Sequence, residues 1–189
     1  MCAAQELNSR WWAEEAKLHP VLPATLRKRA SAPDFPRLCI LAFRDFLQAH
    51  SGILILEGSA FQSSIRFMFA NARPEAEITD YVATWAEEIA AARPRLLLFE
   101  VQDPKAHYAE FVAARRGVEW MDKLIGYVEA TPVAQQHGWC AFDGFLRFWG
   151  EYQRICLACA QTLPWPVKQM PAWSETGAFD ETAGFHFFI

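Results

Sequence analysis

A short apolar run in this chain leads directly into a carboxylate and a glycine, in the segment ILILEGSAFQSSIRF that begins at Ile53. The run Ile53 to Leu56 is continuous rather than alternating, which is typical of a strand covered on both faces inside a parallel sheet. Because such sheets bind ligands beyond the carboxyl ends of their strands, Glu57 would stand where a substrate sits. Gln62 and Arg66 would follow on the first turns of the next helix. A second interpretation is that Glu57 only ends the strand and caps that helix.

Composition places the chain among globular proteins of ordinary size. Its 189 residues fit one domain, 1–189, in which 172–189 is expected to form an irregular tail. The net charge of −4 gives no electrostatic reason to expect nucleic acid as a partner. The N-terminus has no apolar leader core, and no apolar stretch reaches the ~20 residues that span a bilayer, so no membrane partner and a cytoplasmic location are predicted.

The cysteines give little evidence for a disulfide framework or a metal site. There are five, at scattered spacing, which fits a reducing compartment. Cys156 and Cys159 have CxxC spacing, but they lie inside a long helical pattern and no second cysteine or histidine pair accompanies them. No metal site is predicted.

The remaining sequence alternates helical and strand patterns. Apolar periodicity, prolines and glycines predict helices over 6–19, 36–50, 74–93, 104–116, 119–130 and 143–163. Two further strands are expected, over 95–101 and 167–170. The alternation predicts an α/β fold with three layers, a mostly parallel sheet and helices on both faces. Only three strands are found where a sheet of this size normally has about five, so the sheet looks incomplete.

The order of these motifs resembles the C-terminal three-quarters of small P-loop NTPases related to thymidylate and deoxynucleoside kinases. The likeness spans about Trp11 to Met170. It rests on Glu-Gly-x-x-Phe-Gln from Glu57, the strand Pro-Arg-Leu-Leu-Leu-Phe, a following Arg-Arg pair, and His-Gly-x-x-x-Phe-Asp-Gly from His137.

The resemblance implies roles for several side chains. Glu57 would sit beside the transferred phosphate or the accepting hydroxyl as a catalytic carboxylate. The segment holding Ser59, Gln62 and Arg66 would line the pocket for a nucleotide or other small-molecule acceptor. Arg115 and Arg116 would lie on a lid that stabilises phosphate charge. The two arginines are adjacent, so on a helix they diverge by about 100° and only one can face a site; a solvated helix end is the other interpretation.

One essential part of a P-loop kinase is not found. The motif G-x-x-x-x-G-K-[ST] cradles the phosphates and holds Mg²⁺, yet no Gly-Lys pair occurs in the 189 residues. No cofactor is therefore predicted for this chain itself, and ATP and Mg²⁺ are expected only if the complete protein has a phosphate loop. We predict an upstream coding extension that ends in this motif. Without the strand that carries it, the strands at 53–57 and 96–101 must pair directly, admit a substitute, or leave backbone groups unpaired.

Two classes of function therefore stand. The first is a kinase-like phosphotransferase relative, for which present enzymatic activity stays open. The second is a non-catalytic interaction protein that uses an exposed sheet edge and the tryptophan-rich N-terminus, with self-association as one form. Trp11 and Trp12 bear on this choice, because adjacent aromatics on a helix cannot both face one core. His137 is a further candidate for substrate contact, and a plain surface loop is its alternative interpretation.

Overall fold

The computed structural model describes residues 9–12, 19–111 and 117–171. Its contacts group the chain into two compact units, Met1–Ala92 and Arg93–Ile189, called here the N-terminal and C-terminal units. The single domain over 1–189 stays a prediction. Among the described residues, no helix combines the length and apolar character needed to cross a bilayer. The predicted tail, 172–189, lies outside the described residues.

A parallel strand pair organises the N-terminal unit. Strand β2, Ile53–Leu56, confirms the predicted strand, and it pairs with β1, Ser9–Trp12, in the register Ser9↔Ile53 to Trp12↔Leu56. The helix predicted over 6–19 is therefore wrong over 9–12. Residues 13–18 lie outside the described residues. The two tryptophans suit a pleated surface, and cross-strand packing on β2 outweighs the local helical pattern.

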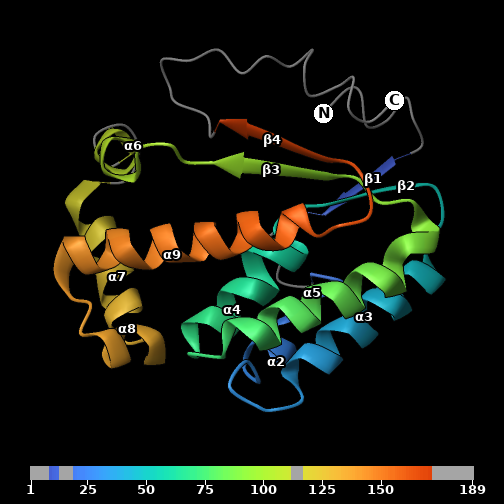
Figure 1. Cartoon of the computed structure of the whole chain (residues 1–189), viewed down its shortest axis with the longest axis horizontal. Coiled ribbons are helices and arrows are strands. Elements are labelled where there is room, and N and C mark those ends of the chain that lie inside the picture. Colours follow the sequence, from blue (N-terminus) through green and yellow to red (C-terminus); the bar gives the residue numbers. More distant parts are fainter. Residues whose placement is uncertain (1–8, 13–18, 112–116, 172–189) are drawn as a thin grey trace. The chain divides into compact units, whose positions relative to one another are not determined.

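The other elements in the described part of the N-terminal unit are helical, and the longest two, α3 and α5, lie side by side (Figure 1). The Trp85 ring makes T-shaped contacts with Phe43 of α3 and with Phe61, at centroid distances of 5.6 and 6.0 Å. These aromatic contacts form the core of the unit. The helical elements are α2 Ala24–Arg27, α3 Phe35–Ala49, the π-helix η1 Ser59–Ile65, α4 Arg66–Ala70, α5 Glu75–Ile89 and the 3-10 turn η2 Ala90–Ala92.

The two faces of the β1–β2 pair differ. Trp12 packs edge-on against Phe46 of α3, with ring centroids 5.0 Å apart, so α3 covers this face. The other face carries Trp11, Ile53 and Ile55, which are 57%, 45% and 37% exposed. The expectation that β2 is covered on both faces is therefore wrong, because α3 covers only one face of the pair.

The C-terminal unit contains the second parallel pair. Strand β3, Leu96–Glu100, confirms the strand predicted over 95–101 and pairs with β4, Val167–Pro171, from Leu96↔Val167 to Glu100↔Pro171. Helices α7 and α9 pack against each other (Figure 1), and the edge of Tyr108 of α6 meets Phe145 of α9 at 4.7 Å. The helices are α6 Pro104–Phe111, α7 Gly117–Glu129, α8 Pro132–His137 and α9 Ala141–Gln161.

Helix α8 lies where the sequence predicted only a loop. Thr131 is its N-cap, and the Thr131 hydroxyl accepts a hydrogen bond from Ala134 N at 3.3 Å, while Pro132 takes the first helical position. These are ordinary start signals for a helix, but six residues are too few to show an apolar period.

The structure confirms an α/β fold with parallel strands and does not confirm the three-layer kinase-like sheet. Among the described residues the strands form two separate two-stranded sheets, β1–β2 and β3–β4. Each strand thus pairs within its own unit, so the alternative in which 53–57 and 96–101 pair directly is wrong for this part of the chain. The predicted strand over 167–170 is confirmed, and β1 adds a strand that the sequence did not reveal.

Candidate functional site

Glu57 follows β2 with its carboxylate exposed. Its N–H donates to the Trp12 carbonyl at 3.0 Å, so the ladder with β1 reaches this residue. Gly58 then takes the left-handed conformation, with φ +64°, which a residue with a Cβ adopts only at a cost. The chain turns at once into the π-helix, whose N-cap position belongs to Gly58 and not to Glu57. The carboxylate therefore stands at the carboxyl end of a parallel strand, as predicted.

The π-helix places the next predicted residues. Ser59 begins it and Gln62 lies in its middle; their backbone is described and their side chains are not. Arg66 follows as the first residue of α4, with its guanidinium carbon 5.2 Å from the centre of the Phe67 ring. Glu57 and Arg66 thus flank the two ends of one π-helix. π-helical turns are rare and occur frequently at functional sites.

A buried polar cluster holds this π-helix in place. The Ser64 side chain lies near Cys39 of α3 and Tyr81 of α5, where it acts to lower the pKa of both groups, and all three residues are buried. Burial raises the pKa of the Cys39 thiol to about 12, and burial also raises the pKa of Tyr81. The Cys39 thiol and the Tyr81 hydroxyl are therefore both uncharged near neutral pH and belong to the buried core. Sequence reasoning missed this cluster, because its members come from three segments far apart in the chain.

His19 lies buried behind the end of β2. Leu22 N donates to its Nδ1 at 3.2 Å, which leaves the proton of the neutral ring on Nε2. Burial lowers the pKa of His19. The Glu57 backbone carbonyl acts in the opposite direction and raises this pKa, while the positive charge of Arg27 lowers it. In the sequence, His19 is the last residue of the helix predicted over 6–19, and it was not among the predicted site residues. A neutral histidine backing the candidate carboxylate is therefore a new element of the site.

The position of the other predicted catalytic residues, Arg115 and Arg116, relative to Glu57 is not described. Arg115 and Arg116 lie in 112–116, outside the described residues. The candidate site within the described residues therefore consists of Glu57, the π-helix and Arg66, with His19 and Ser64 buried beside them.

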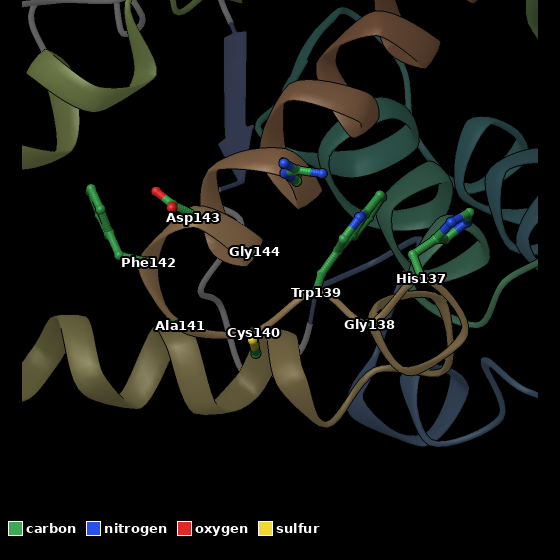
Figure 2. Close-up of a pocket in the computed structure, with 9 residues that line it drawn as sticks. His137, Gly138, Trp139, Cys140, Ala141, Phe142, Asp143 and Gly144 are labelled. Carbon is green, nitrogen blue, oxygen red and sulfur yellow. The ribbon is translucent and has the colours of Figure 1, made fainter.

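The C-terminal unit holds a separate cavity of about 500 Å³ at the junction of α8 and α9 (Figure 2). The His137 and Trp139 rings stack 4.8 Å apart at 17°, and both side chains line the cavity. Figure 2 shows them on one side of the loop and Phe142 and Asp143 on the other, while Cys140 points the opposite way. His137 thus ends helix α8 and lines this hollow, and its contact with a substrate stays a prediction. The lining is completed by Gly138, Ala141, Gly144 and Arg147.

Neither unit offers a metal site in its described residues. No group of three or more histidine, cysteine, aspartate or glutamate side chains lies close enough there to hold an ion. Cys156 and Cys159 are both buried in α9, and burial raises the pKa of Cys156 to about 12. Because metals and oxidants react with the thiolate, the Cys156 thiol is unreactive near neutral pH.

Comparison with known proteins gives no independent assignment. No family model matches the chain, and no curated protein or solved structure matches it either.

Proposed function

We propose that this chain is a relative of the P-loop kinases and binds the acceptor of a phosphoryl transfer at the end of β2. The observation that carries the proposal is the exposed Glu57 at the carboxyl end of a parallel strand, followed directly by a left-handed glycine and a π-helix. Ligands of α/β proteins bind at this end of the strands. The motif order of the sequence supports the same class.

In this proposal Glu57 accepts the proton of an acceptor hydroxyl or stands beside a phosphate-bound Mg²⁺. Arg66 stabilises negative charge on the acceptor or on the transferred group. The neutral His19 adds no second charge behind the carboxylate. Ser59 and Gln62 belong to the same π-helix, the segment that the resemblance assigns to the acceptor pocket.

The donor side of the reaction is not provided by any motif in the 189 residues, since they contain no G-x-x-x-x-G-K-[ST]. Transfer from ATP then requires a phosphate loop from a further polypeptide segment. The proposed role of this chain by itself is acceptor binding.

The test is a thermal-shift panel of nucleosides, nucleoside monophosphates and other small hydroxyl compounds. We expect at least one of them to raise the melting temperature saturably, and Glu57→Gln and Arg66→Gln each to reduce that shift. Glu87→Gln, an exposed carboxylate of α5 in the same unit, is the matched control and keeps the shift. No stabilisation by any acceptor class, or equal shifts in the Glu57 and Glu87 variants, would contradict the proposal.

The open edge of β2 favours a second candidate, a module that accepts an added strand. The Glu57 N–H donates to β1. Because every second residue of a strand directs its N–H and C=O to the same side, the backbone groups of Ile55 also point toward β1. Leu54 and Leu56 direct theirs to the other edge, where the described residues place no strand. The exposed face of Trp11, Ile53 and Ile55 lies beside this edge. A second copy of the chain could supply such a strand.

Proline substitutions separate the two edges of β2. Leu54→Pro removes an N–H that faces the open edge, whereas Ile55→Pro removes one that faces β1. If copies associate through the open edge, sedimentation should show dimers for the wild type and monomers for Leu54→Pro, with the fold retained. Ile55→Pro should instead destabilise the unit. A wild type that sediments only as a monomer at high concentration would remove this candidate.

A further inference from the structure

We propose that the cavity between α8 and α9 binds a small aromatic carboxylic acid that also carries a hydroxyl or amino group. The proposal is independent of the acceptor site at Glu57, because every residue that it uses lies in the C-terminal unit. The cavity volume of about 500 Å³ is within the usual range for small-molecule sites.

Two opposite charges face this cavity without neutralising each other. Asp143 and Arg147 lie four residues apart on α9, the spacing at which opposite charges pair along a helix. Both line the cavity, and within the described part of the chain no ion pair joins them. The guanidinium can bind a carboxylate with two parallel hydrogen bonds. The carboxylate of Asp143 accepts a hydrogen bond from a hydroxyl or amine and repels a second negative group.

The aromatic wall determines the shape of the ligand. Trp139 and His137 stack almost parallel at 4.8 Å and both line the cavity. A flat ring packs well against such a surface, by offset stacking or by its edge. The cavity therefore combines three recognition groups, which match a ring, one acidic group and one hydrogen-bond donor.

The backbone of the loop is fixed before any ligand arrives. Trp139 N donates to Ala134 O at 2.9 Å, and Ala141 N donates to the Glu129 carboxylate at 2.7 Å. Ala141 keeps φ +54°, a conformation that a non-glycine residue holds only where its surroundings enforce it. A Cβ on Gly144 would lie 2.6 Å from the carbonyl carbon of Trp139, so glycine lets α9 approach the loop. A rigid wall of this kind reduces the entropy cost of binding.

The test is calorimetric titration of the full chain with 4-hydroxybenzoate, benzoate and phenol. We expect 4-hydroxybenzoate to bind with a Kd on the order of 0.1–1 mM, as suits a ligand of this size. Benzoate lacks the donor and phenol lacks the acid, so each should bind about tenfold more weakly, which corresponds to the loss of one charged hydrogen bond.

Variants of Arg147 and Asp143 test which residue binds the carboxylate of the ligand and which binds its hydroxyl. Arg147→Gln should weaken 4-hydroxybenzoate about tenfold, while Arg154→Gln, whose arginine pairs with Glu151 on the same helix, should leave the Kd unchanged. Asp143→Asn should remove the preference for 4-hydroxybenzoate over benzoate. Gly144→Ala should abolish binding by displacing Trp139, whereas Gly150→Ala, which has open space for a Cβ, should keep it. The proposal would be overturned if 4-hydroxybenzoate did not bind at concentrations up to 5 mM, roughly fivefold above the expected range. It would also be overturned if Arg147→Gln left the Kd unchanged.

Discussion

In the N-terminal unit, strand β2 runs into an exposed Glu57 and a left-handed Gly58, and the chain leaves through a π-helix. In the C-terminal unit, β3 ends at Glu100, and the N–H and C=O of the next residue, Val101, are both hydrogen-bonded. Val101 N donates to the Gln153 side-chain oxygen at 2.8 Å, and the Gln153 amide donates back to Val101 O at 3.0 Å. A side chain of α9 thus closes the end of one parallel pair, while the end of the other carries a carboxylate toward solvent.

This difference indicates where chemistry can take place. A parallel strand end is a potential ligand site only if its polar groups are not already satisfied by the protein. The Gln153 side chain hydrogen-bonds to the N–H and C=O of Val101, just after β3. The acidic and amide residues near this strand end therefore form no ligand site comparable to that at Glu57. At β2 the supporting contacts come from behind, through His19 and Ser64, and leave the carboxylate available.

The largest effect is expected from opening the closed strand end. Gln153→Leu removes both hydrogen bonds to half-buried Val101, so the free energy of unfolding should fall by about 2–3 kcal/mol. Gln161→Leu, an exposed glutamine at the end of the same helix, should change it by less than about 0.5 kcal/mol. Urea denaturation measures both variants. Equal, small effects would show that Gln153 does not secure the end of β3.

A smaller loss is expected at the exit of the open strand end. Gly58→Ala forces a Cβ into the left-handed region and should destabilise the chain by about 1–2 kcal/mol. Gly126→Ala, in the middle of α7 with open space for a Cβ, should instead stabilise it by up to about 1 kcal/mol. Denaturant midpoints report the sign directly, and a neutral Gly58→Ala would mean that the turn relaxes away from positive φ.

The neutral His19 predicts a pH dependence that the closed strand end lacks. Its pKa is lowered in the folded state, so the unfolded chain binds the proton more readily. The stability from this group is complete above the unfolded value of about 6.5 and is lost as the pH falls through that value toward the folded pKa. His19→Asn should flatten the fall in melting temperature from pH 7 to pH 5. Identical pH profiles for wild type and His19→Asn would contradict this role.

No effect at all is expected from ATP·Mg²⁺ on the isolated chain. The lysine and the cradle of backbone N–H groups that bind triphosphates are not found in the sequence. Calorimetry with up to millimolar ATP·Mg²⁺ should therefore show no saturable heat. Clear saturation that EDTA abolishes would mean that the turn from Glu57 to Ser59 binds phosphate after all.

The features that the sequence predicted correctly are those that depend on residues close together in the sequence. The apolar runs at 53–56 and 96–100, and the carboxylate that ends the first, follow from local composition and turn chemistry. The π-helix does not, because its buried residue Ser64 lies against Cys39 and Tyr81, which are distant in the chain. Strand β1 was missed for a related reason, since SRWW becomes a strand only by pairing with β2. Likewise, no local signal links Gln153 to Val101, 52 residues away.

The most direct test of the acceptor site is calorimetric titration of the best acceptor into wild type, Glu57→Gln and Glu87→Gln. If the exposed strand end binds the acceptor, the Kd should rise about tenfold in Glu57→Gln, which corresponds to the loss of one charge-assisted hydrogen bond, and should stay at the wild-type value in Glu87→Gln. The same Kd for all three proteins would contradict the account, because it would place the acceptor away from the carboxyl end of β2.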